Sequence, residues 1–194
     1  MELSAILERV GTYRANVVTH MSDDVMRAAV ALILHEPEAG SPEILFIERA
    51  TREGDPWSGH MALPGGRQEP EDADLQATAA RETLEEVGVA LRDPVGRLDD
   101  FSGSRNPRVP PLIVAPYVYE MASRPEVTVN HEVSSAVWIP VQWILQPESS
   151  VEYEVERAEL GQTFPAIRYD RYTVWGLTYR ILTNFFEVLG QDFR

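Results

Sequence analysis

Apolar residues recur at helical spacing near both ends of the chain. Positions 3, 6, 7 and 10 are apolar, which predicts an amphipathic lead-in helix over about residues 2–11. Residues 174–189 repeat this spacing and predict a long helix. A short helix is expected at 140–145. Between them are apolar runs of strand length, bounded by proline and glycine, at 26–35, 43–47, 61–63, 89–100, 112–120 and 134–139.

The helix predicted over residues 72–87 has two distinct sides. One side carries an apolar stripe expected to face the core, made of Ala77, Ala80, Leu84 and Val87. On a helical wheel three carboxylates, those of Glu82, Glu85 and Glu86, gather on the opposite side. Gly88 supplies a C-terminal stop. Strands surrounding two long helices predict an α/β fold with a mixed sheet, and 194 residues suit one domain over 1–194.

Composition limits the classes of partner. The chain has 17 basic residues, all arginine, against 31 acidic ones, a net charge of −14. So negative a surface disfavours nucleic acid, and no apolar run has the length of a membrane span. Small phosphorylated ligands remain compatible where a cation or an arginine cluster supplies positive charge. Without cysteine or a secretory signal, the chain is expected in the cytoplasm, and any metal must be held by oxygen or imidazole.

Three carboxylates within one helical turn repel one another, by about a few tenths of a kcal/mol per pair. A hard divalent cation relieves that repulsion, so Glu82, Glu85 and Glu86 are candidate ligands of Mg²⁺ or Mn²⁺. The plain alternative is a solvated acidic face. The preceding turn, Leu63-Pro64-Gly65-Gly66, favours the metal site because paired glycines let backbone approach a ligand closely. Arg81, four residues before Glu85, is placed to orient a carboxylate.

The segment from Gly66 to Val89 resembles the Nudix box, Gly-x5-Glu-x7-Arg-Glu-U-x-Glu-Glu-x-Gly-U with U aliphatic. Arg81-Glu82-Thr83-Leu84-Glu85-Glu86-Val87-Gly88-Val89 carries the match. The gap from Gly66 to Arg81 is one residue longer than in the pattern, and Thr83 replaces an aliphatic residue. Ala73 stands where the first Glu is expected, which leaves Asp72 or Asp74 as its substitute.

The resemblance implies a Nudix-type α/β/α sandwich and a pyrophosphohydrolase that uses Mg²⁺ or Mn²⁺. It implies catalytic roles for Arg81, Glu85 and Glu86. Glu132, in a loop where several relatives carry a metal ligand or general base, is a further catalytic candidate, with an exposed loop acid as the alternative. Either Glu85 or Glu132 is expected to take the proton from water.

Two further stretches resemble coenzyme A pyrophosphatases. Residues 46–50 and 59–66 match the two ends of a segment that precedes the box in that subgroup, whereas the part between them fits poorly. Residues 174–182 resemble a Trp-Gly-x-Thr-x-x-Ile-Leu helix near its C-terminus, which we interpret as mainly a core helix. The subgroup implies coenzyme A as substrate, cleaved to 3′-phosphoadenosine 5′-phosphate and 4′-phosphopantetheine.

The expected substrate-binding residues are basic side chains and the paired glycines: Arg49, Gly65, Gly66, Arg105 and Arg108. Guanidinium groups match phosphate oxygens bidentately, although a solvated basic loop is an equal interpretation for Arg105, Asn106 and Arg108. His20, His35, His60 and His131 show no ligand spacing and are interpreted as structural or exposed.

Two other functions fit the same features. One is a housecleaning hydrolase of an oxidised nucleoside triphosphate, ADP-ribose or a dinucleotide, which would share the metal site and differ in its pocket. The other is a non-catalytic Nudix-like module that binds a nucleotide, although such modules usually lose carboxylates that this chain keeps. A small-molecule nucleotide is the expected partner in each case, and a homodimer is compatible with the sequence.

Overall fold

The computed structural model describes residues 1–19, 25–38, 40–52, 58–103, 111–154 and 162–193. The helices are α1 (Leu3–Thr12), α2 (Leu75–Val87), α3 (Val141–Ile144) and α4 (Gly176–Val188). The strands are β1 (Met26–His35), β2 (Glu43–Arg49), β3 (Met61–Ala62), β4 (Gly65–Arg67), β5 (Gly96–Arg97), β6 (Phe101–Ser102), β7 (Leu112–Glu120), β8 (Val133–Pro140), β9 (Ser150–Glu154), β10 (Thr163–Tyr169) and β11 (Tyr172–Trp175).

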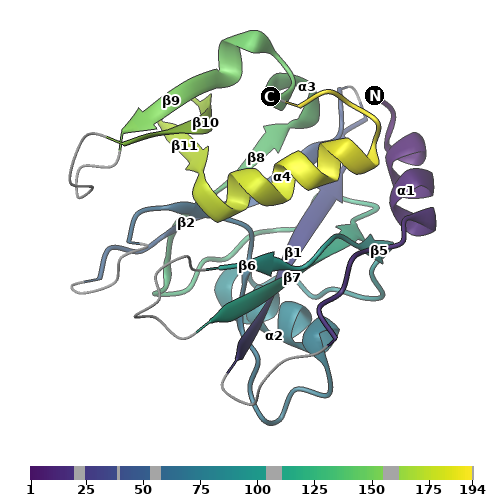
Figure 1. Ribbon diagram of the computed structural model, residues 1–194, viewed down its shortest axis with the longest axis vertical. Helices are drawn as coiled ribbons and strands as arrows, with labels where there is room; N and C mark the ends of the chain where they lie inside the picture. Colours follow the sequence, from purple (N-terminus) through teal and green to yellow (C-terminus); the bar gives the residue numbers. More distant parts are fainter. Residues whose placement is uncertain (20–24, 39, 53–57, 104–110, 155–161, 194) are drawn as a thin grey trace.

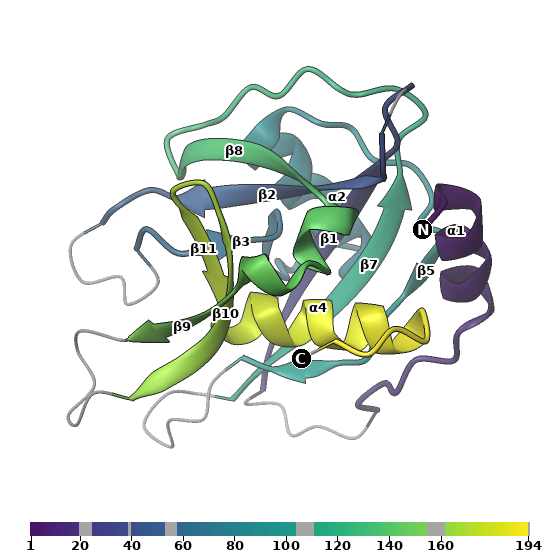
Figure 2. The ribbon, with the colours of Figure 1, turned by 90° about the horizontal axis from the view of Figure 1, so that it is seen from above.

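The described strands β1 to β8 form one mixed sheet with helices on both of its faces (Figures 1 and 2). Along β1, Leu32 and Leu34 point into a core shared with α1 and α4. Ala31 and Ile33 point into a second core, with Val87 of α2. A strand buried on both faces reads as an unbroken apolar run, as 26–35 does. The predicted α/β/α sandwich is therefore confirmed.

Strand β1 separates from β2 after two residue pairs, which opens the sheet where the paired glycines lie. The two strands pair only at Leu34↔Ile44 and His35↔Glu43 among the described residues. Below that point β1 pairs with β4, with Val30 opposite Gly65, while β2 pairs with β3. The glycine turn is thus built into the sheet itself, between β1 and β2.

Helix α2 buries a different face from the one predicted. Asp74 caps its N-terminus by accepting the Ala77 N–H at 2.8 Å, and Gly88 ends it with φ 71°. Its buried line runs at intervals of four and consists of Leu75, Ala79, Thr83 and Val87. Leu84 of the predicted stripe is 53% exposed. The prediction was right at Val87 but wrong elsewhere, because it followed apolar residue types alone, whereas the helix also buries Ala79 and the polar Thr83.

Several other boundaries differ from the predictions. The strand expected over 89–100 shrinks to β5, since Pro94 has no N–H to donate to a ladder. The C-terminal helix begins only at Gly176, with φ 64°, because 172–175 form β11. The separate three-stranded sheet β11-β10-β9 was not predicted.

The lead-in helix, the short helix α3 and strands β1 and β7 are confirmed. No helix among the described residues combines the length and apolarity needed to cross a bilayer.

Candidate active site

A pocket of about 650 Å³ opens where β1 and β2 separate. Glu82 and Glu86 from α2 line it, together with Glu132, Arg49 and the paired glycines. The first turn of α4 lines it as well. That volume lies within the usual range for small-molecule sites, about 300–1,000 Å³. Of the three carboxylates predicted from the box, Glu82 and Glu86 thus meet a ligand-sized space, and Glu85 is not among its described lining residues.

Gly65 and Gly66 let the carboxylates of α2 reach this pocket through the sheet. A Cβ on Gly66 would lie 2.4 Å from the Glu82 carboxylate. A Cβ on Gly65, whose φ is 149°, would lie 2.2 Å from the Ala29 carbonyl oxygen. Both distances are far below van der Waals contact. The close neighbour of Gly66 is therefore an acidic side chain, and that of Gly65 is the backbone of β1.

Glu86 is a buried carboxyl at the pocket wall. Its side chain accepts the Gly65 N–H at 2.8 Å, and the residue is 2% exposed. The pKa of Glu86 is raised to about 7, mainly by burial. The negative charges of Glu82 and Glu132 add to the rise, while the Gly65 N–H and Arg49 oppose it. Burial also raises the pKa of Glu82, against the effect of Arg81.

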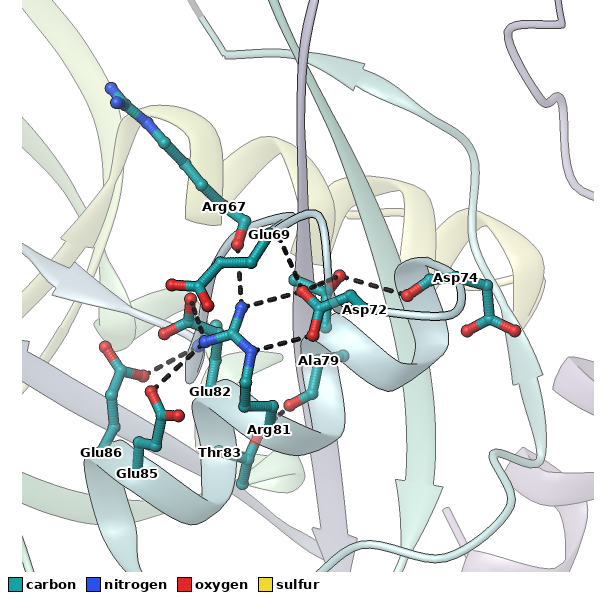
Figure 3. Close-up of polar contacts among 12 residues, drawn as sticks. Arg67, Glu69, Asp72, Asp74, Ala79, Arg81, Glu82, Thr83, Glu85 and Glu86 are labelled. Carbon is teal, nitrogen blue, oxygen red and sulfur yellow. Dashed lines mark hydrogen bonds and ion pairs between the residues drawn. The ribbon is translucent and has the colours of Figure 1, made fainter.

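Arg81 holds the acidic side chains around it in place (Figure 3). Its guanidinium forms two bonds to Asp72 at 2.9 Å and contacts Glu82 at 3.0 Å and Glu85 at 3.3 Å. It also donates to the Arg67 carbonyl at 3.0 Å. Arg81 is not among the described residues that line the pocket. It therefore acts as a positioning residue behind the carboxylates.

The two aspartates considered as substitutes for the first box glutamate are engaged elsewhere. Asp72 accepts from Arg81, from the Thr78 hydroxyl and from the Glu69 N–H, each at 2.9 Å (Figure 3). Arg81 holds the pKa of Asp72 well below its usual range. Asp74 caps α2. Neither is among the described residues that line the pocket. Both therefore organise the start of the helix.

Glu132 reaches the pocket from the loop before β8. Its backbone carbonyl accepts the Ala50 N–H at 2.8 Å, which fixes the loop to the end of β2. Its carboxylate lies 3.0 Å from Arg52, and its side chain is 40% exposed. Glu85, by contrast, has a side chain 54% exposed and lies against Arg81. Of the two carboxylates considered as proton acceptor, Glu132 is the one that lines the pocket.

Some of the remaining candidate residues line the pocket and others do not. Arg49 lines the pocket, whereas Arg105, Asn106 and Arg108 lie outside the described residues. His60 also lines it and is partly exposed there, with its ring 4.7 Å from that of Trp175. His35 is buried in the structure and His131 is exposed. His20 lies outside the described residues.

The C-terminal helix has a role that the sequence interpretation underestimated. Its later residues, such as Phe185, are core residues as expected. Its first turn, however, lines the pocket with Gly176, Leu177 and Thr178. The Thr178 hydroxyl donates to the Met61 carbonyl at 3.1 Å, which joins this turn to β3. The signal that identifies the pocket role was the Trp-Gly-x-Thr resemblance itself.

The glutamates of α2 have the ligand chemistry of a divalent-cation site, but they are not arranged around a single point. Within the described part of the chain, no three acidic or histidine side chains converge at metal-binding spacing. The charge of Glu82 nevertheless disfavours ionisation of Glu86, and the charge of Glu85 disfavours ionisation of Glu82. An oxygen-liganded cation such as Mg²⁺ would offset that repulsion. In charge and ligand type the three glutamates therefore fit the group that the box implies.

Comparison with known proteins gives the family. A family model described as the NUDIX domain matches residues 25–158, so this chain belongs to the Nudix family. It is 30% identical over 164 residues to Nudix hydrolase 15, mitochondrial, of Arabidopsis thaliana, covering 80% of this chain and 56% of that protein. It is 29% identical over 176 residues to the uncharacterized Nudix hydrolase NudL of Yersinia pestis, covering 87% and 84%.

Other matches add a third relative and a solved structure. Identity is 38% over 136 residues to the uncharacterized protein C14C4.10c of Schizosaccharomyces pombe, covering 66% of this chain and 41% of that protein. The chain thus spans about half the length of the Schizosaccharomyces and Arabidopsis relatives. The crystal structure of a MutT/nudix family protein from Enterococcus faecalis covers 100% of this chain and 77% of its own, with 17% identity and a TM-score of 0.53. That likeness shows the fold.

The raised pKa of Glu86 predicts a pH-dependent stability in the metal-free protein. The folded-state pKa of about 7 exceeds the usual 4.5, so the folded chain binds more protons between these values. The stabilising contribution of protonated Glu86 is complete below about pH 4.5 and is lost as the pH rises through about 7. We expect the free energy of unfolding in EDTA to fall by about 1–3 kcal/mol from pH 5 to pH 8.

Urea unfolding of the wild type and of Glu86→Gln at both pH values measures this contribution. The variant should lack that share of the pH dependence, because its amide does not titrate in this range. Equal slopes against pH for the two proteins would contradict the assignment. Added Mg²⁺ should reduce the loss in the wild type, because a cation favours the ionised carboxylate.

Arg81→Gln is expected to destabilise the protein by about 3 kcal/mol, because it leaves the Asp72 carboxylate buried without its cation. Activity should fall as well, since Glu82 and Glu85 lose a shared contact. The measurement is urea unfolding combined with kinetics. Addition of Asp72→Asn should recover part of the stability but not the activity. Additive stability losses in the double variant would show that the pair is not coupled.

Proposed function

We propose that this protein hydrolyses a pyrophosphate bond in a nucleoside diphosphate linked to another moiety, with Mg²⁺ or Mn²⁺ as cofactor. The observation that carries the proposal is the meeting of Glu82 and Glu86 with Gly65 and Gly66 at one wall of a ligand-sized pocket. Membership of a family whose relatives are named hydrolases supports it. The chain keeps the three box glutamates that lie on the helix, although Ala73 replaces the first one, and this argues against the non-catalytic alternative.

Glu82, Glu85 and Glu86 are the residues that would hold the cation. When bound, the cation neutralises phosphate charge and lowers the pKa of a coordinated water. Arg49 at the pocket wall would bind a phosphate oxygen, and Arg81 would keep the carboxylates oriented. We assign to Glu132 the uptake of the proton from the attacking water, because it lines the pocket at the side of Arg49 and Glu86.

Coenzyme A or one of its derivatives is the substrate we propose. The support is spatial, because the two stretches that resemble coenzyme A pyrophosphatases line the same pocket. His60, Met61 and Leu63 come from the first stretch, and Trp175 and Thr178 come from the second. The hydrogen bond from Thr178 to Met61 joins them directly. Cleavage would yield 3′-phosphoadenosine 5′-phosphate and 4′-phosphopantetheine.

A substrate panel tests this proposal. The protein is incubated with Mg²⁺ and coenzyme A, ADP-ribose, NADH, diadenosine polyphosphates or 8-oxo-dGTP, and products are separated by chromatography. Preferred cleavage of coenzyme A, lost in Glu86→Gln, is the expected result. Preferred turnover of another member would keep the chemistry and overturn the substrate. Tight binding by calorimetry without turnover of any member would favour the binding-module alternative.

A further inference from the structure

One part of the pocket extends across β1 to β7, away from the carboxylates, and has a different chemistry. Residues of β1 and β7 form its floor on the face of the sheet that α4 covers, since Ala28 pairs with Val114 in the parallel register. Neighbouring strands are about 4.8 Å apart, so β7 lies roughly 10 Å from the β4 glycines across β1. We call this part the aliphatic channel; it consists of Val30, Leu112, Val114, Leu177 and Ile181.

The aliphatic channel presents apolar surface that the fold leaves incompletely covered. Val114 and Ile181 are buried, at 3% and 2% exposure. Val30, Leu112 and Leu177 are only partly buried, although Val30 and Leu177 pack against the core between the sheet and α4. A ligand group that covers these side chains would remove apolar area from water, which favours binding.

The side chains of the aliphatic channel suit an alkyl group better than a nucleobase. A base needs hydrogen-bond partners for its ring edges. The five channel side chains carry no polar atom, and the neighbouring Thr178 hydroxyl already donates to the Met61 carbonyl. An alkyl chain makes no such demand. The channel is also held in place, because Thr178 ties the start of α4 to β3.

We propose that the aliphatic channel determines specificity by binding an apolar chain attached to the distal phosphate of the substrate. This inference rests on the proposed hydrolysis of a nucleoside diphosphate derivative and not on coenzyme A as its substrate, because the pantetheine group of coenzyme A carries polar amides. The nucleotide diphosphate would lie at the carboxylates, and its organic substituent would extend across β1 towards Leu112. Substrates with longer alkyl substituents should then have lower KM values at similar kcat.

A series of ADP alkyl esters tests the channel without relying on one natural substrate. Methyl, butyl and hexyl esters of the distal phosphate share the same anhydride. Water adds to one phosphorus, the P–O–P bond breaks, and each ester gives AMP and an alkyl phosphate. We expect kcat/KM to rise by about threefold per methylene until the channel is filled, consistent with burial of CH₂ groups. Equal values across the series would overturn the inference.

Two variants test whether the preference for longer alkyl esters arises in the aliphatic channel. Leu177→Asn and Leu112→Asn should each reduce the hexyl-to-methyl ratio of kcat/KM by about tenfold, because each adds a polar amide to the channel. Leu7→Asn is the matched control; this leucine is also partly buried on a helix, but it belongs to α1 and does not line the pocket. It should keep the wild-type ratio. A ratio unchanged in both channel variants would overturn the assignment.

Calorimetry with Glu86→Gln separates this inference from the proposed function. Tighter binding of the hexyl than of the methyl ester, without turnover of any ester or panel member by the wild type, would support the channel and reject the hydrolase. Turnover of the panel together with equal affinities for the esters would reject the channel and keep the hydrolase. Unfolding midpoints of all variants show whether each is folded.

Discussion

Glu86→Gln is expected to lower kcat by about a thousandfold while leaving the fold intact. Glutamine keeps an oxygen that can accept the Gly65 N–H, so the local hydrogen bond survives. It removes the carboxylate that we propose as a ligand of the cation, and preorganised charge of this kind commonly contributes several kcal/mol to the transition state. Kinetics with saturating Mg²⁺ and the best panel substrate measure the effect.

Glu71→Gln provides the control for Glu86→Gln. Glu71 is exposed and precedes α2, so loss of its charge tests whether any acidic residue near the helix affects catalysis. Its kcat should stay within about twofold of the wild type. A similar loss in both variants would indicate a general electrostatic effect. A wild-type kcat in Glu86→Gln would remove Glu86 from the catalytic machinery.

Much of the fold was predictable because the sheet is buried on both faces. The apolar runs that become β1 and β7 require no knowledge of their partners. The sheet β11-β10-β9 escaped prediction for the opposite reason. Its strand β9 alternates exposed and partly buried residues, with Glu152 and Glu154 in a five-residue element. Such a strand has little apolar pattern, and its pairing with β10 supplies what the local sequence lacks.

The chemistry of the site was predictable, whereas the division of labour within it was not. The three box glutamates look equivalent in sequence, yet Glu86 is buried and Glu85 is exposed. Their difference comes from the long-range contact of Glu86 with the Gly65 N–H, whereas the contact of Arg81 with Glu85 follows the predicted four-residue spacing. The role of Asp72 likewise depends on its contact with Arg81, which lies nine residues later in the sequence. A helical wheel of α2 contains neither the Gly65–Glu86 contact nor the Asp72–Arg81 contact.

Gly65→Ala is expected to destabilise the protein by about 3 kcal/mol or more. The new methyl group would lie 2.2 Å from the Ala29 carbonyl oxygen and 2.6 Å from the Val30 Cα, and both belong to the backbone of β1. The φ of 149° adds conformational strain for a residue with a Cβ. Relief requires β4 to move away from β1, which would break their pairing at Val30↔Gly65.

Comparison of Gly65→Ala with Gly59→Ala and Gly66→Ala separates three costs: conformational strain, overlap with backbone atoms and overlap with a side chain. Gly59 has φ 71°, but a Cβ added there would have no described atom within 4 Å, so alanine should cost only about 1 kcal/mol. At Gly66 the overlap is with the Glu82 carboxylate, the movable end of a side chain. That variant should lose activity with a small change in stability. Urea unfolding and kinetics on all three test this order, and a Gly65→Ala protein as stable as Gly59→Ala would show that β1 and β4 can separate at little cost.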